Sequence, residues 1–469
     1  MADSIVKHLY SPAKFKGLSF AEAREAFLQG ADTPTAYLER CLRTIEERDA
    51  SVKAWVTLNV PGARRSAAES TQRYRARQPR SMIDGMPVGI KDLIDTHDMP
   101  TQMGCAAYAG YRPKCDAPVV RALRDAGAII LGKTVTAELG MNQPGPTTNP
   151  FDSRRTPGGS SSGSAAAVGA CMVPAAIGTQ VGGSIIRPSS YCANYALKPT
   201  LGALNRGSAL GLSQEVYGVH AASLEDMWQV VMEIASRVGG DPGYPGLYGL
   251  SMPEAHKPRR LAILETSAWG RLDLGSASAF EKVIHQLRRH GVEILERKNC
   301  GQVEAFECCM AEAKAITDDI NSYELRVIVH ELQQSFPGML SQRLVTRMEK
   351  ANATTQGRYR ELLQRREQAR QRFARLVPTA DALITLSSLG PAPEWEGDLD
   401  PRSVNPAPTG DSSFNVAASL LGAPAITVPM LAVDDLPLGV QIIGQPHDDE
   451  RLCSFARWIK GTLGYVAVP

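Results

Sequence analysis

Two clusters of serine and glycine lie close together in the chain and could carry nucleophilic chemistry. Residues 157–164 read Pro-Gly-Gly-Ser-Ser-Ser-Gly-Ser, and residues 178–184 read Gly-Thr-Gln-Val-Gly-Gly-Ser. Upstream, Lys91 follows an apolar run at residues 87–90. A serine hydroxyl needs a base in contact with it at neutral pH, and a neutral lysine can be that base. The pattern therefore predicts a serine hydrolase whose base is lysine rather than histidine.

Lys91 is the expected base because its sequence neighbours favour burial. These neighbours are Val88, Ile90, Leu93 and Ile94, which suggest the end of a buried strand. Desolvation disfavours the ammonium form, so burial would lower the pKa of this lysine and make the neutral amine accessible. The alternative is a lysine whose ammonium reaches solvent or pairs with a nearby aspartate.

The second cluster predicts a site that can stabilise negative charge next to Ser184. Glycine tolerates sharp turns, so the backbone N–H groups of Val181, Gly182 and Gly183 can point at one place and form an oxyanion hole. An ordinary tight turn, or a helix cap by Ser184, is the structural alternative. The serines of the first cluster could likewise cap a following helix. A phosphate-binding loop is less favoured, because no lysine follows the glycines.

The eight histidines are dispersed and none lies in a glycine-rich turn. His97 and His220 are the nearest in sequence to the segments of interest. A catalytic role for either one is the weaker hypothesis.

The segments around these motifs predict an α/β fold. Residues 119–126 are expected to form a helix and 128–132 a buried strand. Residues 260–295 predict a strand–helix–strand unit with parallel strands. The uncharged stretch 164–186 contains proline, glutamine and four glycines, which favours a buried turn–helix–turn over a membrane span. Other expected helices cover 19–75, 300–377 and 450–460, and other expected strands cover 382–387, 423–430 and 438–443.

Composition narrows the class of protein. The chain has 469 residues and a net charge of +2, so nothing global indicates nucleic acid or an anionic membrane as a partner. The arginine-rich stretch 358–375 is interleaved with glutamate and predicts a solvated helix face rather than an RNA site. Nine scattered cysteines without CxxC spacing favour reduced thiols and argue against a zinc site. Residues 1–7 lack the apolar core of a signal peptide, so we expect a cytoplasmic protein.

Taken together, the motifs resemble the signature of the amidase signature family. The resemblance rests on residues 158–167, 178–185 and 192–200, on 85–92 upstream, and on 422–429 and 436–444 near the C-terminus. It extends from about residue 20 to the end of the chain and is weakest over residues 245–380.

The resemblance implies a triad in which Ser184 is the nucleophile, Ser160 the bridging serine and Lys91 the base. It also implies a cis peptide bond between Gly159 and Ser160, and an oxyanion hole at residues 181–184. The implied fold is α/β, with a single large mixed β-sheet flanked by helices on both faces. Residues 1–75 would form an N-terminal helical segment packed on the core. Residues 76–469 would form the amidase signature domain, with a variable helical region at about 300–380.

The substrate site is less defined. Met103, Leu139, Met141 and Tyr191 are near the motif segments and could form an apolar pocket for the acyl group, although core packing would explain them equally well. No metal or cofactor is expected.

Three segments depart from the family pattern. Gln180-Val181 replaces the usual Asp-Thr or Asp-Ile, the usual arginine after Ser-Ile is replaced by Ile186, with Arg187 one place later, and Cys192-Ala193 replaces the usual Cys-Gly. None of these changes removes a triad residue, but they affect the groups that should orient the nucleophile loop.

The resulting hypothesis is hydrolysis of a carbon–nitrogen bond in a small to medium amide, anilide or carbamate through a serine acyl-enzyme. The alternatives are an amidotransferase subunit that releases ammonia from glutamine, a non-catalytic scaffold of the same fold, and a nucleotide-binding protein. We expect a small-molecule substrate as the partner, with neither nucleic acid nor membrane, and a homodimer stays open.

Overall fold

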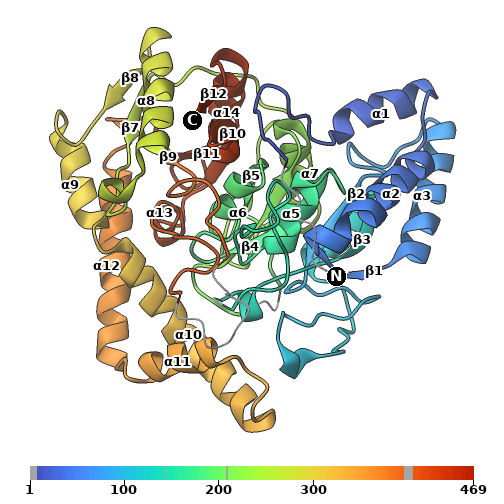
Figure 1. The fold of residues 1–469 in the computed structure, drawn as a ribbon, viewed down its shortest axis with the longest axis horizontal. Coiled ribbons are helices and arrows are strands. Elements are labelled where there is room, and N and C mark those ends of the chain that lie inside the picture. The colour runs from blue at the N-terminus through green and yellow to red at the C-terminus, as the bar shows by residue number, and fades with distance from the viewer. Residues whose placement is uncertain (1–7, 142, 208–209, 396–404) are drawn as a thin grey trace.

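Twelve strands of the described chain join one mixed sheet, which runs through the centre of the molecule (Figure 1). The computed structural model describes residues 8–141, 143–207, 210–395 and 405–469. The strands are β1 (Trp55–Leu58), β2 (Pro87–Lys91), β3 (Ile129–Thr134), β4 (Ala175–Gln180), β5 (Tyr195–Lys198), β6 (Val216–Ala221), β7 (Arg260–Ile263), β8 (Glu293–Leu295), β9 (Ala382–Leu386), β10 (Ala425–Val433), β11 (Leu436–Ile443) and β12 (Val466–Val468).

The order of the strands across the sheet is β1-β3-β2-β4-β6-β5-β10-β11-β9-β7-β8, and β12 pairs with β10. Strand β2 is parallel to both β3 and β4, and β7 is parallel to β8 and β9. The strands between these two parallel groups pair antiparallel. Every residue of β2, β3 and β4 is buried, as expected for strands covered on both faces.

Helices cover both faces of the sheet. They are α1 (Phe20–Gln29), α2 (Pro34–Val52), α3 (Val60–Arg75), α4 (Pro118–Asp125), α5 (Ser162–Gly169), α6 (Ile186–Tyr191), α7 (Leu224–Val238), α8 (Leu274–Arg289), α9 (Gly301–Met310), α10 (Ala313–Ser335), α11 (Gln342–Asn352), α12 (Gln356–Ala374), α13 (Val416–Leu420) and α14 (Asp449–Thr462). One apolar core joins α4, α7, α8 and α14 to one face, and two others join α3, α5, α6, α9, α12 and α13 to the opposite face.

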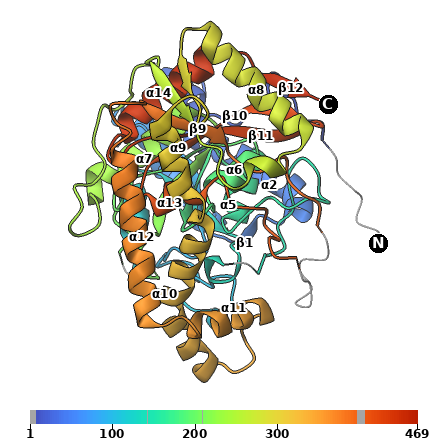
Figure 2. The same ribbon diagram turned by 90° about the vertical axis from the view of Figure 1, so that its left-hand side faces the viewer.

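Helices α10, α11 and α12 form an arm that extends away from the sheet, and we call it the helical arm (residues 313–374). Figures 1 and 2 both show α10 beside α12, with α11 at the far end of α10. Contacts between α10 and both other helices hold the arm together. Its base packs against α13 and thereby against the sheet.

The predicted fold class is confirmed, and so is the parallel strand–helix–strand unit, which is β7-α8-β8. Two local expectations were wrong. The N-terminal segment is not entirely helical, because residues 55–58 form β1 and pair antiparallel with β3 at the sheet edge. The stretch 164–186 contains the central strand β4 between α5 and α6. The division of the chain near residue 75 stays a prediction.

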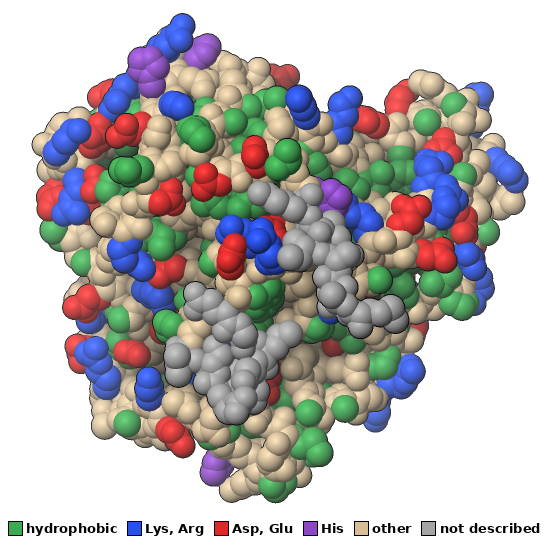
Figure 3. Space-filling model, viewed as in Figure 1, with side chains coloured by type: hydrophobic (Ala, Val, Ile, Leu, Met, Phe, Trp, Pro, Cys, Tyr) green, Lys and Arg blue, Asp and Glu red, His purple; other side chains and the backbone are tan. Residues whose placement is uncertain are grey.

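The distribution of surface charge and the state of the cysteines are as the composition predicts. On the face shown in Figure 3, acidic and basic side chains are interspersed. All nine cysteines are unpaired. Within the described residues no helix is both long and apolar enough to cross a membrane. Residues 1–7, on which the absence of a signal peptide was argued, lie outside the described part of the chain.

The N-terminal helices are tied to the core by one buried carboxylate. Asp226 of α7 accepts hydrogen bonds from the backbone N–H groups of Phe20 (2.9 Å) and Ala21 (3.0 Å), at the start of α1. The residue at the usual capping position, Ser19, makes no side-chain bond to this helix. A side chain from α7 therefore replaces the local cap.

Replacing Asp226 by alanine should lower the free energy of unfolding by about 1–3 kcal/mol, because two N–H groups lose their acceptor in a buried place. Urea unfolding followed by circular dichroism measures this loss. Glu233→Ala is the matched control, since Glu233 lies on the same helix and pairs with Arg237 on the surface. It should cost about 0.5 kcal/mol or less. Equal losses in the two variants would contradict the capping role.

Candidate active site

The carboxyl ends of β2 and β4 bring Lys91 to the centre of the molecule. The two strands are parallel and adjacent, so their ends meet at the same edge. Lys91 is the last residue of β2 and is fully buried. Its Nζ lies 2.8 Å from Thr179 Oγ1 and 3.4 Å from the Thr179 carbonyl oxygen on β4. It also lies 2.8 Å from Ser160 Oγ.

Ser160 comes from the turn that precedes α5. The peptide bond between Gly159 and Ser160 is cis. The other serines of this cluster are used elsewhere: Ser161 Oγ donates to Thr179 O (3.2 Å) and Ser162 Oγ donates to Val135 O (3.3 Å). Within the described chain Ser160 is the serine of this cluster that contacts Lys91. Helix α5 has no side-chain cap, so capping does not explain the cluster.

Ser184 lies in the loop between β4 and α6. It is 7% exposed, and within the described residues its hydroxyl makes no hydrogen bond, to Ser160 or to any other group. The same holds for the backbone N–H groups of Val181, Gly182, Gly183 and Ser184, none of which donates a hydrogen bond in the described part of the chain. The loop therefore presents unused donors beside a free hydroxyl, as an oxyanion hole requires.

Gln180 fixes the shape of this loop. Its Oε1 accepts from the N–H groups of Ile185 (2.8 Å) and Ile186 (3.1 Å), at the start of α6. Its Nε2 donates to the Gly182 carbonyl (3.1 Å) and to Ser419 Oγ (3.2 Å). One buried amide thus holds both ends of the loop, and helix α6 needs no cap from Ser184.

Arg187 is buried and contacts the turn that carries Ser160. Its Nη2 donates to the Gly159 carbonyl (2.7 Å) and its Nε donates to the Thr409 carbonyl (2.8 Å). The guanidinium therefore ties the turn that carries Ser160 to the segment before α13. Gly159 contributes this carbonyl and packs against Thr409, where an added β-carbon would lie 2.8 Å from Cγ2.

The surroundings of Lys91 disfavour its charged form. Burial lowers the pKa of Lys91 from 10.5 to about 7, and the nearby Glu215 opposes part of this shift. Glu215 is itself fully buried, and burial raises its pKa to about 7. The groups in hydrogen-bonding contact with Lys91 are neutral oxygens, so a neutral amine is accessible near physiological pH.

An apolar cluster covers the site on the side of the helical arm. Leu139 and Met141 are buried in it and Met103 packs against it. Val181 lies at its edge, and helices α10 and α11 complete it with Leu325, Val329, Leu332, Leu344 and Met348. Tyr191 lies elsewhere. It is buried at the end of α6, in the core that contains α5, so it does not share the cluster with Met141.

The two histidines considered in the sequence do not contact these serines. His220 is fully buried, its Nδ1 lies 2.7 Å from Ser189 Oγ, and burial lowers its pKa to about 3. His97 is half exposed and pairs with Asp116 (3.0 Å).

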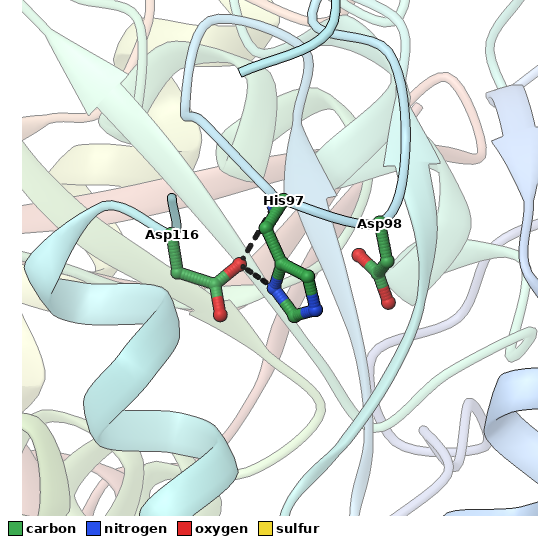
Figure 4. Close-up of side chains that lie close together, drawn as sticks. All are labelled: His97, Asp98 and Asp116. Carbon is green, nitrogen blue, oxygen red and sulfur yellow. Dashed lines mark hydrogen bonds and ion pairs between the residues drawn. The ribbon is translucent and has the colours of Figure 1, made fainter. Parts of the chain in front are cut away.

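One group of metal-ligand side chains occurs among the described residues, and it comprises His97, Asp98 and Asp116 (Figure 4). Arg124 donates to both carboxylates, to Asp98 at 2.7 Å and to Asp116 at 3.0 Å. Both carboxylates already have a cationic partner, so the group forms an ion-pair network that holds this loop against α4.

The structure brings Lys91 and Ser160 together as the sequence predicted, while the role of Ser184 stays a prediction, and sequence reasoning missed Thr179 and Glu215. Thr179 was visible only as part of the glycine-rich motif, and nothing in the sequence indicated that its oxygens face the lysine. Gln180 and Arg187 had been singled out as departures from a pattern, and the structure shows the contacts that they make.

Comparison with known proteins shows the family of this chain. A family model described as Amidase matches residues 36–453. A glutamyl-tRNA(Gln) amidotransferase subunit from Chloroflexus aggregans is 30% identical over 466 residues, covering 93% of this chain and 94% of that protein.

Two solved structures extend the likeness to three dimensions. One is described as the crystal structure of amidase; it has a TM-score of 0.80 and 26% identity, and covers 95% of this chain and 100% of its own. The native peptide amidase of Stenotrophomonas maltophilia has a TM-score of 0.74 and 27% identity, covering 95% and 97% respectively. The match spans nearly the whole chain, and the chain belongs to the amidase signature family.

Proposed function

We propose that this protein hydrolyses the carbon–nitrogen bond of small to medium amides, anilides or carbamates through an acyl-enzyme on Ser184. The observation that carries the proposal is the 2.8 Å contact between the buried Lys91 Nζ and Ser160 Oγ. A lysine that is isolated from water and has no carboxylate in hydrogen-bonding contact can act as a base.

The proposed reaction moves one proton along two hydroxyls. Neutral Lys91 takes the proton of Ser160, and Ser160 takes the proton of Ser184 as its Oγ attacks the carbonyl carbon. The carbonyl oxygen becomes an oxyanion, which accepts from the free N–H groups of residues 181–184. Catalytic contacts often tighten only with substrate bound, so the bond between Ser160 and Ser184 is expected to form in the complex.

Collapse of the tetrahedral intermediate breaks the carbon–nitrogen bond. The leaving nitrogen takes the proton held by Lys91, delivered through Ser160, and departs as an amine. Water then attacks the Ser184 ester along the same proton route and releases the carboxylic acid. Lys91 takes a proton when each tetrahedral intermediate forms and gives it up when that intermediate collapses, so it is neutral again after acylation and after deacylation.

The acyl half of the substrate is proposed to be apolar. The cluster beside Val181 contains leucine, methionine and valine side chains from the loop at Leu139 and Met141 and from the helical arm. Met103 and Val181 are only partly buried on this cluster, so their side chains can contact an aliphatic or aromatic group of the substrate.

A second candidate is an amidotransferase subunit that releases ammonia from glutamine. It is favoured by the relative described as a glutamyl-tRNA(Gln) amidotransferase subunit, which matches this chain over nearly its full length. Hydrolysis of glutamine that requires a co-purified partner protein would support this candidate over the first.

Ser184→Ala should abolish labelling by a fluorophosphonate and reduce turnover to the residual level that binding and the oxyanion hole provide. Mass spectrometry of the labelled protein identifies the modified serine, and a panel of aryl amides, primary amides, carbamates, esters and glutamine measures turnover. Ser189→Ala is the control, because Ser189 is also buried but contacts His220. Label on another serine would refute the assignment of the nucleophile.

Activity should depend on pH through Lys91. Protonation removes the base, so kcat/KM should fall about tenfold per pH unit below an apparent pKa of about 7. Glu215→Gln removes a negative charge that favours the ammonium, so the acid limb should move to lower pH. Stopped or continuous assays between about pH 5 and 9 cover the transition. An unchanged profile in Glu215→Gln would contradict the coupling.

Lys91→Met should lower turnover by about 10³-fold or more, since both proton transfers lose their acceptor. Lys198→Met tests whether the loss of any buried lysine is enough to lower turnover. Lys198 is equally buried, and burial lowers its pKa to about 7, but it donates to the Pro199 carbonyl and lies outside the site. Comparable losses in both variants would point to folding rather than to catalysis.

Gln180→Leu should slow turnover about 10–100-fold with little change in KM, because the nucleophile loop loses the acceptor at Ile185 and Ile186 while the substrate pocket stays intact. The rate of fluorophosphonate labelling should fall in parallel. Gln229→Leu, a largely buried amide on α7 that donates to Ser251 O, should leave both rates unchanged. A rise in KM alone would contradict a role in positioning the nucleophile.

A further inference from the structure

A cavity of about 490 Å³ lies against the loop that follows Lys91, and none of the proposed steps uses it. It opens between the loop that follows β2, the first turn of α4, the loop before β6 and helix α10. Its apolar and aromatic walls include Leu93, Met103, Tyr108, Leu210 and Ile328. Its size fits a small organic group.

This cavity shares walls with the candidate active site. An added β-carbon at Gly140 would lie 3.0 Å from Leu93 Cδ1 and 3.6 Å from Ser160 Oγ. The Leu93 side chain and the Ser160 hydroxyl therefore both lie beside Gly140. Met103 and Leu210 pack against the same apolar cluster as Val181, at the nucleophile loop. A substrate bound at Ser184 could therefore extend one half into the cavity.

Carboxylates outnumber free cations in the cavity. Asp95 lines it, and its Oδ1 is buried without a hydrogen-bond partner. The nearest buried ammonium, Lys133, is already 3.1 Å from Asp92 Oδ1, so one positive charge is shared by two carboxylates. Glu331 of α10 also lines the cavity and forms no ion pair within the described chain.

The remaining charged groups of the cavity are balanced. Arg206 pairs with Asp241 (2.6 Å), and Asp116 pairs with Arg124 (3.0 Å). Asp95 and Glu331 are therefore the carboxylates whose charge the protein leaves uncompensated or only partly compensated.

Tyr217 adds a second aromatic wall. It lines the cavity and is only 3% exposed. The aromatic faces of Tyr108 and Tyr217 also suit a cation.

We propose that this cavity binds the amine half of the substrate and selects leaving groups that carry a second, protonated amine on an apolar body. The apolar spacer packs on Met103, Leu210 and Ile328, and the ammonium is held by Asp95 and Glu331. The amide nitrogen stays at Ser184, where the bond breaks. This inference rests on the proposed amide hydrolysis and defines the substrate class for it.

Binding can be measured without turnover. Calorimetry on the Ser184→Ala protein would compare benzylamine, benzyl alcohol and benzoate, which are cationic, neutral and anionic near neutral pH. Benzylamine should bind at least about tenfold more tightly than the other two, as expected for a hydrogen-bonded charge. Absence of benzylamine binding, or a preference for benzoate, would overturn the proposal.

Two variants assign the binding to the cavity. Asp95→Asn and Glu331→Gln should each weaken benzylamine at least about tenfold and leave benzyl alcohol unchanged. Glu331 is exposed on α10, so its variant keeps the proposal testable even if Asp95→Asn fails to fold. Glu281→Gln, on the distant helix α8, is the matched control and should have no effect. Equal weakening in the control would overturn the assignment.

Kinetics separate this inference from the proposed function. Two amides of the same apolar carboxylic acid can be compared. The N-(5-aminopentyl) amide should have a kcat/KM at least about tenfold above that of the N-pentyl amide, mainly because its KM is lower. Glu331→Gln should remove this preference. Equal rates for both amides would overturn the inference and leave amide hydrolysis standing. Failure to hydrolyse either, with benzylamine binding intact, would overturn the proposed function and leave the cation site standing.

Discussion

An amine held away from water with neutral oxygens as its hydrogen-bonding partners is the constraint on which the rest of the site depends. Lys91 contacts Ser160 and Thr179, and burial shifts its pKa toward neutrality. Lys133, on the adjacent strand β3, is equally buried but pairs with Asp92. A carboxylate partner favours the charged form, whereas hydroxyl partners leave the amine free to exchange protons. The same residue type thus serves two purposes on neighbouring strands.

Placement of this amine follows from the parallel pairing of β2 and β4, and placement of the nucleophile loop follows from one buried amide. Gln180 ends β4 and binds both the start of α6 and the Gly182 carbonyl. Arg187 secures the opposite side, at the turn that carries Ser160. Both loops are therefore held by side chains from rigid elements, which is the arrangement that precise chemistry requires. The free N–H groups of the loop stay available because Gln180 satisfies their neighbours.

Much of this could be predicted from sequence, and the exceptions have physical reasons. The apolar run before Lys91 and the glycine-rich clusters are local signals, and their joint resemblance to the amidase signature implied the fold class and the contact between Lys91 and Ser160. Strand β1 was missed because four residues between two helices are too few to show a period. The partners of Gln180 were missed because Ser419 lies 239 residues away. Contacts of this kind depend on the assembled sheet and leave no local trace.

The helical arm supplies much of the apolar cover of the site, yet it lies outside the sequence motifs on which the family resemblance rests. The sheet and its loops provide Lys91 and both serines, whereas α10 and α11 provide Leu325, Val329 and Met348. The residues proposed for the chemistry and much of the apolar cover thus come from separate stretches of the chain. Substitutions in the arm can therefore reshape the cover of the site without touching the strand end and the turn that hold Lys91 and Ser160.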